Sequence, residues 1–232
     1  MLDGYLDGGP MASSWQRLKW TLKYRFGRPG HVPAFDTLLN RPHRTILLDR
    51  LDGLGPWRSL LEVGCGRGVN LLLTAKRKPD AKLTGIDTSV AAIRTTRVEL
   101  ARRGMKDFHL EVGSVSNLTG LADQSFDVVL ADAVLMYVPP AEIVDALSEM
   151  LRVARFGIVA GVWNSDIPPP ASAWLYDEGT WVYDYRRILG GLGCINADVE
   201  SYPEGVWDDG RWQKYGSILL IGRNANSGRG QP

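Results

Sequence analysis

Short apolar runs alternate with amphipathic segments between residues 59 and 162, and this alternation predicts strands separated by helices. The expected strands are residues 59–63, 82–86, 108–112, 126–131 and 153–162. The expected helices are residues 69–78, 89–104 and 141–152, and the last of these repeats apolar residues at the spacing of one helical face. Such a β-α-β alternation predicts an α/β fold in which helices cover both faces of a parallel sheet.

The pattern changes in the last third of the chain, which is rich in aromatic residues. Residues 168–170 are three prolines and predict a loop, and residues 180–192 predict a helix that ends at glycines. Residues 194–202 and 215–222 predict two further strands, joined by a long turn that contains Trp207 and Trp212. The complete sheet is therefore expected to have seven strands and to be mostly parallel.

Composition and charge narrow the classes of function. The 232 residues contain 27 Lys and Arg against 26 Asp and Glu, and this net charge of +1 argues against a nucleic-acid-binding protein. Two cysteines do not make a disulfide-stapled secreted scaffold, so a cytoplasmic location is expected. No apolar run approaches the roughly 18–20 residues that a membrane-spanning helix needs. The Cys and His spacings are not those of a metal site, so no metal is expected.

Residues 1–58 precede the first strand and are expected to form a helical extension. Segment 11–35 carries five basic residues and no acidic residue, together with a short apolar stripe. We expect this segment to cover the ligand-binding crevice as a lid. The alternative is a helix that lies on a membrane surface. Residues 223–232 are rich in Gly, Asn and Ser, which predicts a flexible tail.

The strongest chemical signal is a strand that leads into a glycine-rich turn and then a helix. The turn contains Gly64, Gly66 and Gly68, and glycines let a ligand approach the backbone closely. Asp87 follows at the end of the next strand, where a carboxylate can accept hydrogen bonds from ribose hydroxyls. The pattern indicates a site for a ligand that contains a nucleoside.

Three such ligands compete, and the residues around the turn separate them. A triphosphate loop needs a Lys followed by Ser or Thr, and neither pair follows Gly68. The dinucleotide fingerprint needs a glycine where this chain has Val69. Glu62 at the strand's end would repel a pyrophosphate but suits a ligand with an ammonium group. S-adenosylmethionine has a ribose, a sulfonium, an ammonium and no phosphate, so it fits best.

Taken together, these features resemble the class I S-adenosylmethionine-dependent methyltransferases. Residues 62–68 are similar to the family's first motif, residues 83–89 to its second, and residues 126–140 to the motif of its fourth strand. The resemblance covers residues 60–161 and implies a Rossmann-like, doubly wound sheet. It also implies that residues 59–222 form the S-adenosylmethionine-binding methyltransferase domain, with an aromatic-rich insertion near residues 164–212.

The resemblance assigns cofactor contacts residue by residue. The glycine turn would flank the methionine part of S-adenosylmethionine, Glu62 would orient its ammonium, and Asp87 would bind its ribose. Ser114 and Val115 would meet the adenine, although Ser114 replaces the family's usual aspartate with an uncharged acceptor. The implied cofactor-binding residues are Glu62, Gly64, Cys65, Gly66, Gly68, Asn70, Asp87, Thr88, Ser114, Val115, Ala131 and Asp132.

Methyl transfer from a sulfonium is an in-line displacement that depends mainly on proximity and orientation. A general base is needed only where the acceptor carries a proton with a high pKa. The candidates for a catalytic role are His31, His43, Asp132 and Tyr137. His109 lies in the third expected strand and is expected to be structural.

The predicted function is methyl transfer to a small-molecule, glycan or lipid-linked acceptor. The alternatives are methylation of a protein or peptide, and a regulatory module that binds S-adenosylmethionine without turnover. Residues 132–135 read Asp-Ala-Val-Leu and not the Asn-Pro-Pro-Tyr type of motif found in relatives that methylate nucleic-acid amino groups. A nucleic-acid acceptor is therefore not expected.

Overall fold

The computed structural model of the chain describes residues 35–166, 173–177, 180–194 and 196–222. Several predictions fall outside these ranges: the expected lid up to residue 34 with its candidate His31, the proline loop at 168–170, and the tail at 223–232. The fold and the site are described from the remaining residues.

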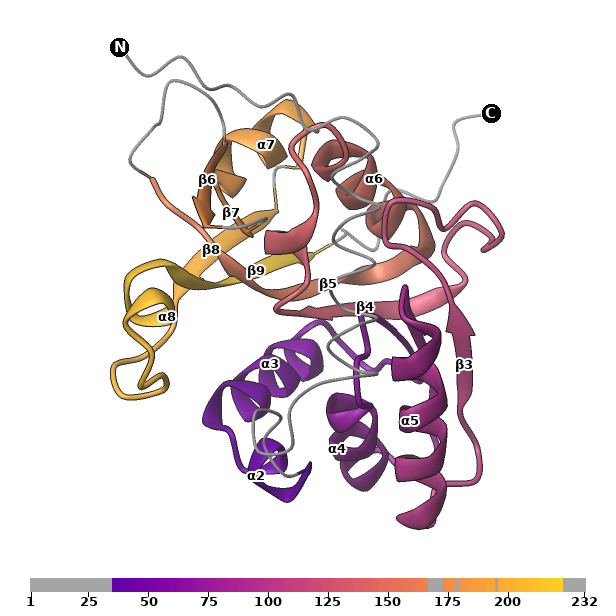
Figure 1. Cartoon of the computed structure of the whole chain (residues 1–232). Coiled ribbons are helices and arrows are strands. Elements are labelled where there is room, and N and C mark those ends of the chain that lie inside the picture. The colour runs from indigo at the N-terminus through magenta and orange to yellow at the C-terminus, as the bar shows by residue number, and fades with distance from the viewer. Residues whose placement is uncertain (1–34, 167–172, 178–179, 195, 223–232) are drawn as a thin grey trace, which may run out of the picture.

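Seven strands form one sheet in the order β3-β2-β1-β4-β5-β9-β8 (Figure 1). The strands are β1 (Ser59–Val63), β2 (Lys82–Asp87), β3 (His109–Val112), β4 (Phe126–Asp132), β5 (Ala154–Trp163), β8 (Ala197–Ser201) and β9 (Gly216–Gly222). The strands β1 to β5 are parallel to one another, and β9 runs antiparallel to both of its neighbours. The predicted fold class, an α/β fold with a mostly parallel seven-stranded sheet, is confirmed.

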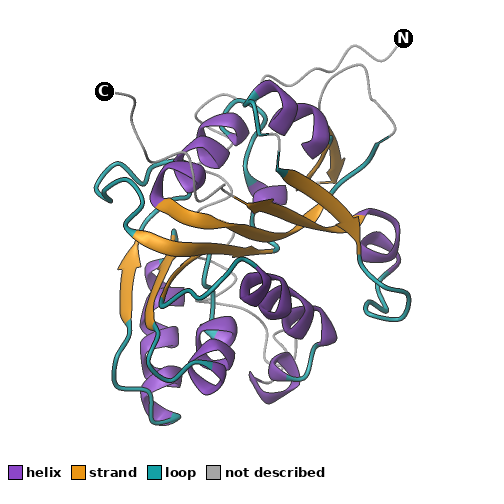
Figure 2. Cartoon of the chain, turned by 180° about the vertical axis from the view of Figure 1, so that it is seen from behind, coloured by secondary structure: helices purple, strands orange, loops and turns teal. Residues whose placement is uncertain are grey.

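Helices cover both faces of the sheet, as Figure 1 and, from behind, Figure 2 show. One face carries α2 (Phe35–Leu39), α3 (Pro42–Gly53), α4 (Val69–Arg77) and α5 (Val90–Arg102), and the other carries α6 (Ile143–Val153) and α7 (Tyr185–Gly191). Successive strand residues point to opposite faces, so Leu60 joins the core with α3 to α5 and Leu61 the core with α6. Among the described helices, none is both long and apolar enough to cross a bilayer.

The helix α3 joins the N-terminal extension to the core of the sheet. Leu47 and Leu51 are completely buried, in the same core as residues of β4 and β5. The helix begins with Pro42, and the first turn of a helix is where proline is best tolerated. The next two residues, His43 and Arg44, contact Asp132 at the carboxyl end of β4.

Residues 180–192 do not form a single helix, so that prediction is wrong in its first part. Thr180–Tyr183 form β7, which pairs with β6 (Ala173–Asp177) in a two-stranded sheet. These four residues of β7 are β-branched or aromatic, which favours a strand. Asp184 then begins α7 by accepting a hydrogen bond from the backbone N–H of Arg187 at 3.0 Å. The expected long turn between β8 and β9 likewise contains a short helix, α8 (Gly210–Tyr215).

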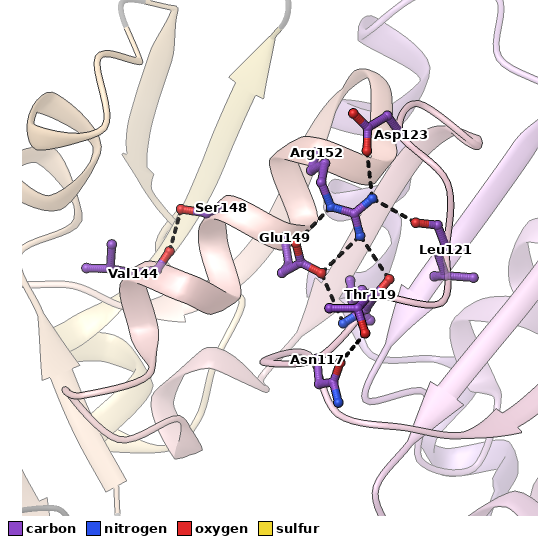
Figure 3. A network of polar contacts seen from close by, with 9 residues as sticks. Asn117, Thr119, Leu121, Asp123, Val144, Ser148, Glu149 and Arg152 are labelled. Carbon is purple, nitrogen blue, oxygen red and sulfur yellow. Dashed lines mark hydrogen bonds and ion pairs between the residues drawn. The ribbon is translucent and has the colours of Figure 1, made fainter.

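One arginine fastens the connection after β3 to α6 (Figure 3). Arg152 donates hydrogen bonds to the carbonyl oxygens of Leu118 at 2.9 Å and Leu121 at 2.7 Å. It also donates to the carboxylates of Asp123 and Glu149, each at 2.8 Å. Glu149 in turn accepts a hydrogen bond from the backbone N–H of Leu118 at 3.2 Å. These contacts hold the connection between β3 and β4 against the helix that follows β4.

Candidate active site

The turn between β1 and α4 is built on glycines that no other residue could replace without strain. Gly64, Gly66 and Gly68 have φ angles of 67°, 52° and 74°, in the left-handed region. A Cβ atom at Gly64 would lie 2.3 Å from the side chain of Val134, and one at Gly68 would lie 2.6 Å from Thr96. The turn therefore requires glycine both for its backbone conformation and for its close contacts.

Asp87 at the end of β2 holds this turn in place. Its Oδ2 accepts a hydrogen bond from the backbone N–H of Gly66 at 3.0 Å, and its Oδ1 accepts one from Ser89 at 2.8 Å. Burial raises the pKa of Asp87, and the two backbone hydrogen bonds partly offset that effect. Each carboxylate oxygen has two lone pairs, so the group retains acceptor capacity for a ligand. Asp87 thus links the end of β2 to the turn that follows β1.

Five polar residues meet where β1, β4, α3 and α4 come together, and we call them the polar cluster: His43, Arg44, Glu62, Asn70 and Asp132. The Nδ2 of Asn70 donates to Oε1 of Glu62 at 2.8 Å and to Oδ2 of Asp132 at 3.1 Å. The Nη1 of Arg44 lies 2.8 Å from Oδ1 of Asn70 and 2.5 Å from Oδ2 of Asp132. The Nε2 of His43 lies 3.4 Å from the same Oδ2.

The two carboxyl groups of the polar cluster have opposite preferences for a proton. Burial raises the pKa of Glu62 from 4.5 to about 8, only partly countered by the hydrogen bond from Asn70 and the charge of Arg44. Burial acts in the same direction on Asp132, but Arg44, His43 and Asn70 outweigh it and hold the pKa of Asp132 below its ordinary range. The Oε2 of Glu62 is buried and has no hydrogen-bond partner among the described residues. The cluster therefore offers an unsatisfied acceptor beside the glycine turn.

The expected adenine side lies on the connection that follows β3. The backbone N–H of Gly113 donates to the carbonyl oxygen of Asp87 at 3.1 Å, so this connection starts beside the end of β2. Ser114 accepts a hydrogen bond from the backbone N–H of Ser116 at 3.3 Å, and Val115 is buried. The turns after β1, β2, β3 and β4 thus meet at one edge of the sheet, where ligands of parallel α/β sheets bind.

Aromatic rings from the last third of the chain pack against the polar cluster, and we call them the aromatic stack: Tyr202, Trp207 and Trp212. The ring of His43 stacks on Trp207 with centroids 4.1 Å apart, and Trp207 stacks on Trp212 at 4.2 Å. Tyr202 presents its edge to His43 and to both tryptophans. The hydroxyl of Tyr202 is buried without a hydrogen-bond partner among the described residues, and burial raises its pKa. The stack provides an aromatic wall next to the ends of β4 and β5.

Comparison with known families agrees with this arrangement. A family model described as a methyltransferase domain matches residues 60–157, the segment that carries the glycine turn, Asp87 and Asp132. The match identifies residues 60–157 as a methyltransferase domain. The similarity to that family, inferred from the motifs, is confirmed.

Relatives of this methyltransferase domain share about a third of its residues. The nocamycin O-methyltransferase of Saccharothrix syringae is 35% identical over 134 residues, which are 56% of this chain and 45% of the relative. The ubiquinone biosynthesis O-methyltransferase of Paracidovorax citrulli is 32% identical over 105 residues, 44% of this chain and 43% of the relative. The chain thus spans less than half of the length of these curated relatives.

Solved structures show the same fold. The 1,6-didemethyltoxoflavin-N1-methyltransferase of Burkholderia thailandensis, with bound 1,6-didemethyltoxoflavin and S-adenosylhomocysteine, matches with a TM-score of 0.69. The match covers 96% of this chain and 92% of that chain at 16% sequence identity. At this level of identity the likeness concerns the fold of the methyltransferase domain.

The structure brings most of the expected site residues of the methyltransferase domain to one edge. The glycine turn, Asp87 and the connection after β3 are adjacent, and Glu62, Asn70 and Asp132 meet in the polar cluster. Of the further implied contacts, Cys65 is buried, with a thiol pKa raised by burial, Thr88 is half-buried beside Asp87, and Ala131 is buried in β4. Their contacts with a cofactor remain predictions.

Two of the candidates for the catalytic role, His43 and Asp132, are in direct contact. Tyr137 lies in the 3-10 turn η1 (Leu135–Tyr137) and packs on a cluster around Met136, to which Trp212 of the aromatic stack also belongs. His109 was expected to be structural, but its side chain is 66% exposed on the edge strand β3. Roles for His43, Asp132 and Tyr137 remain predictions.

Sequence reasoning missed Arg44, Tyr202 and Trp207 as members of this site. Arg44 and Asp132 are 88 residues apart in the chain, and nothing in the local pattern distinguishes a buried arginine from an exposed one. The only available signal was that Arg44 follows the candidate His43 in the segment before β1. The sequence places Trp207 in the long turn of the aromatic-rich region and Tyr202 at the end of the strand expected at 194–202, and neither position indicates where the ring packs.

Proposed function

We propose that this chain transfers the methyl group of S-adenosylmethionine to a small-molecule acceptor. The observation that carries the proposal is that a buried carboxyl group and an arginine lie on the two sides of Asn70, beside the glycine turn. Glu62 presents a buried oxygen without a partner among the described residues, and Arg44 lies on the other side of Asn70. The amino-acid end of S-adenosylmethionine is a zwitterion, so it needs an anion for its ammonium and a cation for its carboxylate.

The residues fit such a ligand along its whole length. An ammonium at Glu62 would satisfy an orphaned buried acceptor, which otherwise costs about 1–3 kcal/mol of stability. Arg44 would hold the carboxylate, Asp87 the ribose hydroxyls, and Ser114 with Val115 the adenine. When bound, this cofactor supplies a methyl group that its sulfonium activates. The chain's part is then to bind, to orient and to exclude water.

The acceptor class rests on the relatives and on the aromatic stack. The two curated relatives are named for ubiquinone biosynthesis and nocamycin, and the solved structure holds didemethyltoxoflavin, all small molecules. Trp212, at the outer end of the aromatic stack, is half-buried and offers an apolar ring that suits an organic acceptor, including a glycan or a lipid-linked precursor. Transfer to peptides alone would favour the protein-methylating alternative, and binding without any transfer would favour the regulatory one.

Calorimetry with S-adenosylhomocysteine tests the proposal directly. We expect micromolar affinity, about −8 kcal/mol, and no competition by ATP or NAD. Gly66→Val should abolish binding while leaving the fold intact, because a β-branched side chain cannot adopt the φ of 52° found at Gly66. Gly120→Val is the matched control, since a Cβ atom there would meet nothing within 4 Å. Preferential binding of ATP or NAD, or unchanged affinity in a folded Gly66→Val variant, would contradict the proposal.

A further inference from the structure

His43 occupies a buried position between a carboxylate and an indole ring. The residue is 2% exposed, although it lies in the first turn of α3. Its Nε2 lies 3.4 Å from Oδ2 of Asp132, and its ring lies nearly parallel to Trp207, with an angle of 21° between the planes. Tyr202 packs its edge against the same ring, with centroids 6.5 Å apart. These contacts fix the orientation of the imidazole.

The contact with Asp132 decides which ring nitrogen of His43 carries the proton. Arg44 keeps Asp132 ionised, and an ionised carboxylate only accepts hydrogen bonds. The proton of the neutral ring therefore sits on Nε2, and Nδ1 is left with a free lone pair. Nδ1 is buried and has no hydrogen-bond partner among the described residues. A neutral imidazole held in this way can accept a proton from a ligand.

Two other polar atoms near His43 are also buried without partners in the described part of the chain. They are the hydroxyl of Tyr202 and Oδ1 of Asp132. Both face Gly161 of β5, where a Cβ atom would lie 2.8 Å from the Tyr202 oxygen and 3.4 Å from Oδ1. Buried polar groups are normally hydrogen-bonded, so three orphaned atoms around one strand end indicate a ligand with polar atoms.

We propose that His43 is the general base of the reaction, and that the acceptor presents to it an O–H group that must lose its proton, such as a phenol or an enol. This inference rests on the proposed function and names the acceptor chemistry of that site. The lone pair of Nδ1 suits a hydroxyl that must lose its proton. Asp132 is a positioning residue, because it holds Nε2–H and stabilises the imidazolium that forms.

The proton and the electrons of the step balance without any further reactant. The proton of the acceptor O–H goes to Nδ1 of His43, while the oxygen lone pair forms the new bond to the methyl carbon. The carbon–sulfur bond breaks, and its electron pair stays on sulfur, which becomes a neutral thioether. The products are the methyl ether, the thioether and the imidazolium of His43. The imidazolium then returns its proton to water.

The tautomer of His43 is the first test, and it requires no acceptor. Nitrogen NMR of the full chain with labelled imidazoles, saturated with S-adenosylhomocysteine, reads which ring nitrogen is protonated. We expect the neutral form of the His43 ring to carry its proton on Nε2, and we expect Asp132→Asn to lose this preference. A neutral ring with its proton on Nδ1, or an unchanged tautomer in Asp132→Asn, would overturn the proposal.

The second test compares His43→Asn with His109→Asn, whose histidine is exposed on β3. Both variants should bind S-adenosylhomocysteine within about twofold of the wild type, because neither residue is assigned to the cofactor. With phenol as the probe, transfer by His43→Asn should fall by roughly 100-fold or more and His109→Asn should be unaffected. With 4-nitrophenol, a far stronger acid that is largely ionised at about pH 8, the loss should shrink to less than about tenfold.

The outcomes separate this inference from the proposed function. No binding of S-adenosylhomocysteine by the wild type would overturn the proposed function itself. Binding by the wild type with no transfer to any phenol would overturn the acceptor class proposed here. Equal losses with phenol and 4-nitrophenol would assign His43 a structural role. If His43→Asn does not fold, the tautomer of the wild type decides the question.

Discussion

The ends of β1 and β4 lie beside one another in the sheet, and each places a buried carboxyl group in the polar cluster. Glu62 and Asp132 accept hydrogen bonds from the same nitrogen of Asn70. Even so, the pKa of Glu62 is raised to about 8, whereas the pKa of Asp132 is lowered. The difference comes from α3, because Arg44 and His43 contact only the second of the two. One cation thus selects which carboxyl is ionised and leaves the other ready for a ligand cation.

The largest expected effect is on stability, when each carboxyl group is replaced by its amide. Asp132→Asn leaves the buried charge of Arg44 without its partner, so we expect it to lower the free energy of unfolding by about 3 kcal/mol. Glu62→Gln keeps the hydrogen bond to Asn70 and removes the cost of holding a proton that the unfolded chain releases, so we expect it to raise the free energy of unfolding at pH 7 by up to about 3 kcal/mol. Urea unfolding at pH 7 measures both. Equal effects of the two variants would show that Arg44 does not distinguish the carboxyl groups.

The same two strand ends show what could be predicted from sequence. Gly64, Gly66 and Asp87 were predicted because their requirements are local: a left-handed turn needs glycine, and the turn follows directly from β1. The pairing of Arg44 with Asp132 was not predictable, because it depends on how α3 packs against β4. The helix predicted at 180–192 failed for a related reason, since the pairing of β7 with β6 outweighs the local pattern.

Glu62 should contribute to the binding of S-adenosylhomocysteine, although it lowers the stability of the fold at pH 7. Glu62→Gln removes the anion that we assign to the ligand's ammonium, so we expect affinity to fall by about 1–3 kcal/mol, roughly 10- to 150-fold. Calorimetry at about pH 8, where the wild-type carboxyl is half ionised, measures the loss. Leu73→Ala serves as a control for general loosening of α4, because Leu73 packs in the core and lies outside the polar cluster. Wild-type affinity in Glu62→Gln would remove Glu62 from the cofactor site.

The raised pKa of Glu62 makes both binding and folding depend on pH. The ligand's ammonium favours the ionised form, so binding below pH 8 should release about one proton, and affinity should rise up to tenfold per pH unit. The free energy of unfolding depends on pH with the opposite sign. The folded state keeps a proton that the unfolded chain releases between pH 4.5 and 8, so stability falls by about 1.4 kcal/mol per pH unit at most across that window. The contribution of Asp132 has the usual sign and lies at lower pH, below 3.8.

Calorimetry in buffers of different ionisation enthalpy counts the released protons, and Glu62→Gln should abolish the release. The difference in unfolding free energy between wild type and Glu62→Gln, followed from about pH 5 to pH 8, isolates the folding effect. Proton release that persists in Glu62→Gln would assign the titration to another group, and Asp87 would be the next candidate because burial raises its pKa as well.

The smallest expected effect concerns the backbone conformation of the turns after β1 and β4. Both bend through the left-handed region, at Gly64 with φ of 67° after β1 and at Ala133 with φ of 58° after β4. A side chain in this conformation costs about 1–2 kcal/mol, and glycine loses about 0.5–1 kcal/mol more backbone entropy on folding. Ala133→Gly should therefore stabilise the protein by up to about 1 kcal/mol. Thermal unfolding of the two forms at equal pH measures the change.

The reverse substitution in the other turn is the matched control for Ala133→Gly. Gly64→Ala adds the same methyl group that Ala133→Gly removes, but its Cβ atom would lie 2.3 Å from the side chain of Val134. We expect it to destabilise the protein by more than the conformational strain alone, and Val134→Ala should restore part of the loss by making room. If Ala133→Gly is destabilising instead, the methyl group of Ala133 packs well enough to outweigh its strain. The turn after β4 would then be held by side-chain packing, whereas the turn after β1 depends on having no side chain.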